Sequence, residues 1–336
     1  MNELRAGNAH MIGVLLGLVF AVIISAPSMA TISAQEEVYE LKSSGAHAEI
    51  QKAKEAILVD DFATALKILE PLAEDGDPVA QLNLGVMYRR GHGVEKDEEK
   101  GIYLYKLSAE QEFAGAQHNL AAVLYNDAET ATVRSAAVEL FMLAAKQGNQ
   151  PSIEVIEAMF EQGLKAAKSG KYDIALREWA PLADNGSARA QMNLGTMYSK
   201  GDGVDKDAQV ALGWYLKAAE QGLLDAQFRV AQMYEDGEGT ESKPVKALYW
   251  FGRAAKQGDV RSQLIISAAL ALGEVVPRDA GGALFWAYAA EIEGSQDAEP
   301  MVKMLEKAIL KKADKSKLQK IKDFVRDCVK KKYEGC

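Results

Sequence analysis

The chain of 336 residues repeats itself at a fixed offset of 110 residues. The stretch LGVMYRRGHGV at 84–94 returns as LGTMYSKGDGV at 194–204, with seven of the eleven letters unchanged. The match stays in register from ALKILEPLAEDG at 65–76 to AAKQGN at 144–149. A duplication of this size restricts the chain to folds that are built from equivalent units.

A shorter period lies inside the duplicated block. Ala-Gln occurs at 80–81 and again at 116–117, and then at 190–191 and 226–227, so each step within a block is 36 residues. The alternating pattern of β-strands is nearly absent, and only 8 prolines interrupt a chain rich in Ala, Leu, Glu, Lys and Gln. This period and composition predict an all-α fold of helix–turn–helix units stacked as a solenoid.

The expected helices can be located from their apolar stripes and their ends. In ALGWYLKAAEQG, Ala211, Trp214, Tyr215 and Ala218 fall on one helical face. Gln-Gly at 147–148, 221–222 and 257–258 predicts a helix end at which glycine takes the left-handed conformation. Asp97 and Asp207 are expected to cap the helix that follows each of them.

The repeated Gly-x-Gly admits two interpretations, a phosphate-binding loop or a turn between helices. A phosphate-binding loop requires a preceding strand and a following Lys-Ser or Lys-Thr, and neither copy has them. The spacing therefore predicts turns between the two helices of equivalent hairpins.

The letters at these positions resemble the Sel-1-like repeat family, a branch of the tetratricopeptide-like helical repeats. The stretch from Ala190 to Gly222 satisfies nearly the whole family pattern, and 80–111 and 226–258 satisfy much of it, whereas 116–149 and 262–293 are degenerate. The resemblance implies an α/α superhelix with a concave surface. The residues that carry the repeat pattern are Gly85, Tyr88, Gly91, Gly93, Gly195, Tyr198, Gly201, Gly203, Trp214, Tyr215, Gly237, Gly239, Trp250 and Trp286.

Four segments are expected along the chain. Residues 1–30 have a basic start, a fourteen-residue apolar core and small residues before Ala30, the pattern of a cleaved secretory signal peptide. The alternative is an uncleaved inner-membrane anchor, but the apolar core is short for a bilayer. A first repeat block at 45–149 and a second at 150–295 follow, and basic capping helices occupy 296–336. Export predicts a periplasmic or secreted protein.

The C-terminal segment differs from the body in charge. Residues 301–336 carry a net charge of +7 and the other 300 residues carry −16, and an acidic body argues against nucleic acid as a partner. The two cysteines, Cys328 and Cys336, can close a small loop in an oxidising compartment, and a free pair is the alternative. The basic segment is expected to cap the last repeat or to contact anionic components of the envelope weakly.

Catalytic and metal-binding motifs are missing from the remaining residues. The chain contains neither His-Glu-x-x-His nor Cys-x-x-Cys, and neither Ser-x-x-Lys nor Gly-x-Ser-x-Gly. We therefore expect no catalytic residue, metal or cofactor.

The family resemblance implies a non-enzymatic scaffold of the bacterial cell envelope that binds a protein or peptide. The alternatives are an envelope enzyme or binding protein acting on peptidoglycan or β-lactams, and an assembly subunit for exopolysaccharide export. By resemblance to groove-binding tetratricopeptide-like proteins, polar first-helix residues are candidates for the peptide contact, with ordinary exposed polar residues as the alternative. These candidates are Asn83, Arg89, Asn119, Asn193 and Arg229.

Overall fold

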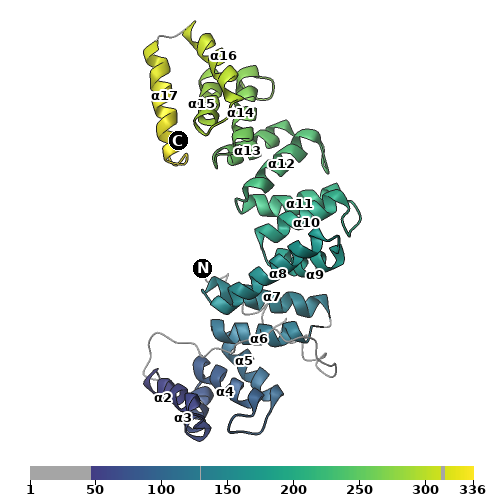
Figure 1. Ribbon diagram of the computed structural model, residues 1–336, viewed down its shortest axis with the longest axis vertical. Helices are drawn as coiled ribbons and strands as arrows, with labels where there is room; N and C mark the ends of the chain where they lie inside the picture. Colours follow the sequence, from purple (N-terminus) through teal and green to yellow (C-terminus); the bar gives the residue numbers. More distant parts are fainter. Residues whose placement is uncertain (1–46, 129, 312–314) are drawn as a thin grey trace. The chain divides into compact units, whose positions relative to one another are not determined.

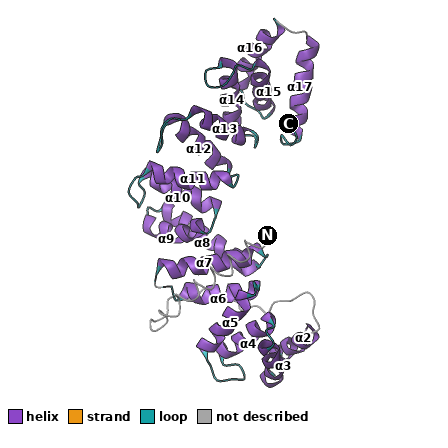
Figure 2. Cartoon of the chain, turned by 180° about the vertical axis from the view of Figure 1, so that it is seen from behind, coloured by secondary structure: helices purple, strands orange, loops and turns teal. Residues whose placement is uncertain are grey.

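The computed structural model describes residues 47–128, 130–311 and 315–336, and every regular element in them is an α-helix (Figures 1 and 2). The predicted signal peptide at 1–30 lies outside the described residues. The helices of the first half are α2 (His47–Leu58), α3 (Phe62–Glu74), α4 (Pro78–Arg90), α5 (Glu98–Glu110), α6 (Ala114–Asn126), α7 (Ala131–Lys146), α8 (Gln150–Lys168) and α9 (Tyr172–Asp184). Those of the second half are α10 (Ala188–Lys200), α11 (Ala208–Glu220), α12 (Leu224–Asp236), α13 (Pro244–Ala255), α14 (Val260–Leu272), α15 (Ala280–Ile292), α16 (Ala298–Leu310) and α17 (Lys315–Lys330).

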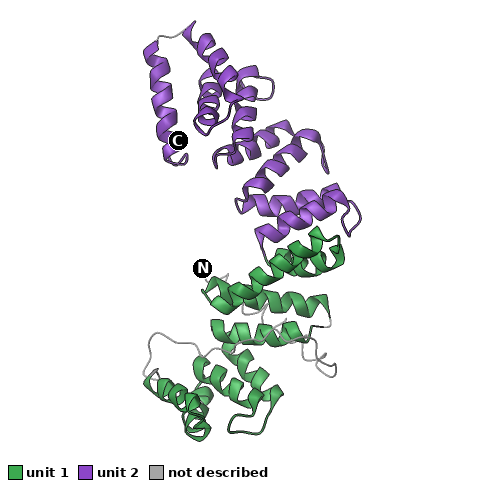
Figure 3. Ribbon diagram, viewed as in Figure 1, with its two compact units in different colours: residues 1–185 green, residues 186–336 purple. Residues whose placement is uncertain are grey.

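The chain forms two compact units, which meet in sequence between Asn185 and Gly186 (Figure 3). Unit 1 holds α2 to α9 and unit 2 holds α10 to α17. The division lies beyond the block boundary at 149/150 that the sequence suggested, because α8 and α9 pack against α7 and so belong with the first unit. Within each unit consecutive helices pack as hairpins, and the predicted all-α fold of stacked hairpins is confirmed.

The turns between the helices of a hairpin follow from a few residues. Gly201 ends α10 with φ +81°, and its N–H donates to the carbonyl of Met197 at 2.8 Å. Asp207 then caps α11 by accepting from the N–H groups of Gln209 and Val210 at 2.9 and 3.0 Å. The predicted aspartate cap is confirmed in both units, because Asp97 accepts from the N–H of Lys100 in the same way.

A pair of hydrogen-bonded glutamines joins the two helices in four of the described hairpins, α4/α5, α6/α7, α10/α11 and α12/α13. In unit 2, Gln221 Nε2 donates to Gln191 Oε1 at 2.8 Å, and Gln257 Nε2 donates to Gln227 Oε1 at 2.8 Å. The two members of each pair are thirty residues apart and join the end of a second helix to the start of the first helix of the same hairpin. The glutamine of each Gln-Gly motif is therefore the donor, and the glutamine of each Ala-Gln motif the acceptor, of one hydrogen bond.

Each unit has a core of alanine and large apolar side chains between its hairpins. In unit 1, Tyr105 and Phe141 are fully buried beside Leu120. In unit 2, Phe251 and Trp250 are buried against α12. Trp214 and Trp286, at the same repeat position as Trp250, are only half-buried, and Lys217 lies over the ring of Trp214 at 4.0 Å.

The last two helices close the end of unit 2. Leu305 of α16 and Leu318, Val325 and Cys328 of α17 are buried in one cluster with the apolar side chains of α15. Cys328 and Cys336 are joined by a disulfide.

Candidate functional site

The predicted partner-binding residues Asn83, Asn119, Asn193 and Arg229 occupy one repeat position, in the middle of four first helices. In unit 1 this position is closed, since Asn83 is 2% and Asn119 is 1% exposed. The Nδ2 of Asn83 donates to the carbonyl of Val79 in its own helix at 2.8 Å. The expectation that these two side chains are exposed polar residues is therefore wrong, because both are enclosed by packing.

The same position is accessible in unit 2, where Asn193 and Arg229 are half-buried. The guanidinium of Arg229 donates to Glu238 Oε2 at 2.6 Å and to Ser199 Oγ at 3.3 Å, and it lies 5.9 Å from the centre of the Tyr215 ring. Ser199 belongs to α10, so Arg229 on α12 joins two neighbouring first helices. The Nδ2 of Asn193 is itself buried, and nothing among the described residues accepts a hydrogen bond from it.

A row of apolar side chains lies beside this polar row in unit 2. Met192, Phe228 and Leu264 precede Asn193, Arg229 and Ile265, and all six are half-buried. The guanidinium of Arg261 lies 3.9 Å from the centre of the Phe228 ring and pairs with Asp259 at 2.8 Å. We call the six residues at 192, 193, 228, 229, 264 and 265 the first-helix face of unit 2.

Only the polar half of this face was predicted from the sequence. The apolar half was missed because an apolar residue at helical spacing is typical of a core stripe. Its signal was the constant spacing of 36 residues between Met192, Phe228 and Leu264, beside a polar row with the same spacing.

Arg89, the fifth predicted contact, lies near the end of α4. It is half-buried, and its guanidinium lies 5.7 Å from the centre of the Tyr105 ring. It stands at the repeat position of Ser199, not at that of the asparagines, so the structure does not place it in the same row.

Unit 1 contains a buried histidine that no motif in the sequence indicated. His118 on α6 is 2% exposed, its Nδ1 lies 2.9 Å from Ser152 Oγ, and its ring contacts Phe141. Burial lowers the pKa of His118 to about 4, so the imidazole is neutral near pH 7. Sister units have Leu82, Met192, Phe228 or Leu264 at this position, which makes His118 a polar residue in an apolar place.

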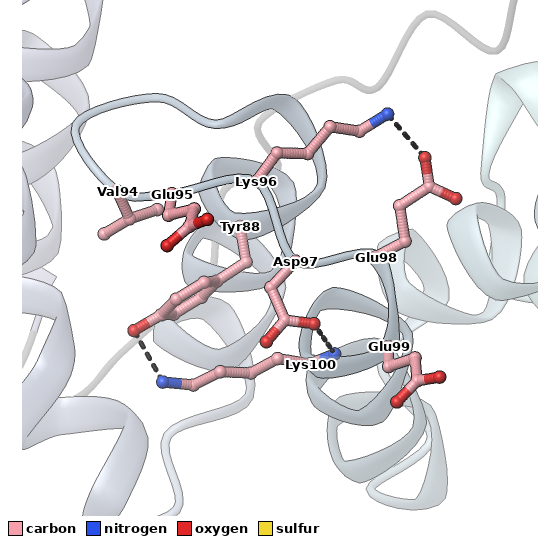
Figure 4. Close-up of a pocket in the computed structure, with 8 residues that line it drawn as sticks. All are labelled: Tyr88, Val94, Glu95, Lys96, Asp97, Glu98, Glu99 and Lys100. Carbon is pink, nitrogen blue, oxygen red and sulfur yellow. Dashed lines mark hydrogen bonds and ion pairs between the residues drawn. The ribbon is translucent and has the colours of Figure 1, made fainter.

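A surface hollow of about 620 Å³ lies at the turn between α4 and α5 (Figure 4). The Nζ of Lys100 donates to the hydroxyl of Tyr88 at 2.6 Å, and Lys96 pairs with Glu98 at 2.5 Å. The hydrogen bond from Lys96 lowers the pKa of the Glu98 carboxyl. These side-chain contacts hold the turn between α4 and α5.

The described part of the chain offers neither a metal cluster nor a membrane span. Within residues 47–128, 130–311 and 315–336, no group of three or more His, Cys, Asp or Glu side chains could hold a metal ion. No helix in these same ranges is long and apolar enough to span a bilayer.

Four stretches of the chain match the family model described as Sel1 repeat, at residues 78–113, 114–149, 188–223 and 224–259. The first and third begin with α4 and α10, and the second and fourth begin with α6 and α12. The stretch at 116–149, which departs from the family pattern, thus matches the same repeat model.

Two curated proteins share part of this sequence. The chain is 29% identical over 140 residues to a putative sel1-like repeat-containing protein L21 of Acanthamoeba polyphaga mimivirus, which covers 42% of this chain and 25% of that protein. It is 31% identical over 125 residues to the ERAD-associated E3 ubiquitin-protein ligase component HRD3 of Candida glabrata, which covers 35% of this chain and 14% of that protein. The chain thus matches a quarter or less of the length of these relatives.

Two solved structures also resemble the chain. One is c5321, a protective antigen present in uropathogenic Escherichia coli strains and displaying an SLR fold, with 25% identity, a TM-score of 0.43 and coverage of 77% of this chain and 56% of that one. The other is a Sel1 repeat protein from Oxalobacter formigenes, with 27% identity and a TM-score of 0.37. The match covers 74% of this chain and 98% of that one.

Proposed function

Because this chain contains four Sel1 repeats, we propose that it is a non-enzymatic scaffold that binds a protein partner through the first-helix face of unit 2. Sel1 repeats generally mediate protein–protein interaction. The observation that carries the proposal is the difference between the units: the repeat positions that are buried in unit 1 are half-exposed in unit 2.

The chemistry of the face favours an extended peptide segment of the partner. Met192, Phe228 and Leu264 offer apolar surface at regular intervals, which gains free energy when it is covered. Beside them, the carboxamide of Asn193 carries one donor group and one acceptor, the same pair that a peptide group presents. Its Nδ2 is buried and has no hydrogen-bond partner among the described residues, so a peptide carbonyl can accept from it only once the Asn193 side chain turns toward the partner.

The experiment begins with affinity capture from envelope extracts by the mature protein, followed by identification of the bound partner. Binding of the purified partner is then measured by calorimetry for Asn193→Ala and Ile265→Glu. We expect each substitution to weaken binding about tenfold or more, the order of an interface contact that matters.

Tyr249→Ala is the matched control, because Tyr249 is 60% exposed on the second helix α13 and lies outside the face. It should leave the affinity unchanged. A partner that binds all three variants as tightly as the parent chain would refute this face as the binding surface.

We place the scaffold in the bacterial cell envelope, either in the periplasm or outside the cell. The signal pattern at 1–30 supports export, and the disulfide between Cys328 and Cys336 is of the kind that persists in oxidising compartments. Fractionation of cells that express the full chain tests this assignment. Recovery of the uncut chain in the inner membrane would instead support an anchor.

A weaker contact of the C-terminal cap with anionic envelope components has its own support. Lys303, Lys307 and Lys311 line a hollow of about 420 Å³ on α16, together with Glu306 and Leu310. Co-sedimentation with phosphatidylglycerol vesicles, but not with phosphatidylcholine vesicles, is the expected result. Lys307→Glu combined with Lys311→Glu should abolish it, and binding that survives this change would exclude the hollow.

A further inference from the structure

The C-terminal turn, residues 331–336 after α17, packs against the hairpin formed by α14 and α15, which is the last hairpin of unit 2. Tyr333 makes the contact. The Tyr333 side chain is 9% exposed and its ring stacks on that of Trp286 on α15, with centroids 5.7 Å apart. Its hydroxyl donates to Glu293 Oε1 at 2.9 Å and accepts from Gln263 Nε2 at 2.8 Å. The turn thus contacts both helices of this hairpin at once.

The repeat pattern changes at Glu293, the residue that accepts a hydrogen bond from the Tyr333 hydroxyl. Earlier hairpins of unit 2 have Gln221 and Gln257 at this position, each donating to a glutamine thirty residues before it. The last hairpin has Glu293 instead, a side chain that accepts hydrogen bonds. Its Oε2 accepts from Gln263 Nε2 at 3.0 Å, which leaves Oε1 for the tyrosine hydroxyl. The carboxylate therefore fits a hairpin that is closed by the turn.

The turn has an unfavourable backbone, which must be held in place. Lys332 and Tyr333 have φ of +50° and +64°, and neither is glycine. Two consecutive residues in the left-handed region persist only where other contacts compensate. The N–H of Tyr333 donates to the carbonyl of Cys328 at 2.8 Å, and the disulfide joins Cys328 to the last residue, Cys336.

The two cysteine residues differ in their exposure to solvent. Cys328 is fully buried against the apolar side chains of α15 and α17, whereas Cys336 is exposed. A thiolate from solution can therefore reach the disulfide only at the sulfur of Cys336. We propose that Cys328–Cys336 is a thiol–disulfide exchange site, attacked at Cys336, whose reduction by a dithiol releases the C-terminal turn from the last hairpin.

The exchange is an ordinary two-step reduction. A thiolate of the dithiol bonds to the Sγ of Cys336, the bond between Cys336 and Cys328 breaks, and Cys328 leaves as a thiolate that takes up a proton. The second thiol of the reductant then attacks the reductant sulfur that is bonded to Cys336, which closes the disulfide of the reductant and releases Cys336 as a thiolate that takes up a proton. The protein gains two electrons and two protons, and the dithiol becomes a disulfide.

Release of the turn uncovers a specific surface. Tyr333 then no longer covers the face of the Trp286 ring, nor the side chains of Gln263 and Glu293. The first-helix face of unit 2 is made of other residues. The exchange site thus controls a second surface of the protein, independently of the partner contact proposed above.

The test uses the full mature chain under native conditions. Incubation with oxidised and reduced glutathione, followed by peptide mass spectrometry, should give an adduct on Cys336 and none on Cys328. Incubation with dithiothreitol should reduce the disulfide while the helical circular dichroism is retained. Amide hydrogen exchange should then accelerate about tenfold or more at residues 328–336 and stay unchanged in α10 to α13.

Cys336→Ser provides a permanently open form without added reductant. It should show the fast exchange at 328–335 that dithiothreitol produces in the parent chain, and dithiothreitol should add nothing further. Three results would overturn the proposal: a disulfide that is reduced only in denaturant, an adduct on Cys328, or a Cys336→Ser turn that stays as protected as the parent's.

Discussion

Gly195 on α10 faces the ring of Tyr215 on α11 so closely that a β-carbon on Gly195 would lie 2.7 Å from the ring carbons Cδ1 and Cε1. Unit 1 repeats the arrangement, with 2.8 Å between a β-carbon on Gly85 and the Tyr105 ring. Both distances are shorter than van der Waals contact, so the two helices of these hairpins lie as close as they do because one of them presents a glycine.

Gly195→Ala should therefore destabilise the chain, although alanine is the better helix former. The added methyl group must push a buried aromatic ring or separate the helices, and overpacking of this kind costs about 1–3 kcal/mol. The free energy of unfolding in urea measures the effect.

Gly213 supplies the control, because it lies on α11 of the same hairpin and a β-carbon added there would meet nothing within 4 Å. Gly213→Ala should stabilise the chain by about 0.5–1 kcal/mol, since a solvent-facing glycine inside a helix loses more backbone entropy than alanine on folding. Stabilisation by both substitutions would contradict close packing at Gly195.

Gly201→Val should destabilise unit 2 for a different reason, which lies in the backbone. Gly201 has φ +81°, and a left-handed conformation costs an L-residue about 1–2 kcal/mol, more for a β-branched one. Thermal unfolding of Gly201→Val and Gly201→Asn distinguishes the cost of the left-handed backbone from the cost of a larger side chain, because asparagine tolerates the left-handed region and valine does not. Equal losses in the two variants would exclude the φ angle as the cause.

The sequence predicted the hairpins well because their rules are local and repeated. The Gly-x-Gly turns, the aspartate at 207 and the Gln-Gly ends each depend on a few neighbouring residues, so the printed letters suffice to place them. The division of the chain at Asn185 was not predictable in this way, since it depends on how α8 and α9 pack against α7.

The candidate site was predictable only in part, because burial is a tertiary property. Asn83, Asn119 and Asn193 stand at the same repeat position, yet the first two are enclosed and the third is half-exposed. The contact of Tyr333 with Gln263 spans 70 residues and follows no repeat spacing, so no pattern in the sequence indicated it.

Truncation of two tryptophans at one repeat position should have unequal effects. Trp250 is 7% exposed, and Trp250→Ala should cost about 3–5 kcal/mol through the cavity that it leaves. Trp214 is half-buried beside Lys217, so Trp214→Ala should cost clearly less. Urea unfolding of both variants checks the order, and an equal or greater loss for Trp214→Ala would contradict the burial seen here.

His118 should make the stability of the chain depend on pH between about 6.5 and 4. Its pKa is about 4 in the folded chain and about 6.5 when unfolded, so within this interval the unfolded chain binds the proton more readily. Stability from the neutral imidazole is therefore fully present above pH 6.5 and is lost as the pH falls to 4. A shift of this size corresponds to about 3 kcal/mol.

His118→Leu isolates this contribution from that of the carboxyl groups, which titrate in both proteins. Leucine stands at the equivalent positions Leu82 and Leu264, so the repeat accommodates it. Urea unfolding at pH 7.5 and pH 4.5 should show that the parent chain loses about 2–3 kcal/mol more than the variant on acidification. An identical loss in both proteins would mean that His118 takes up its proton in the folded chain as easily as in the unfolded one, which its burial against Phe141 opposes.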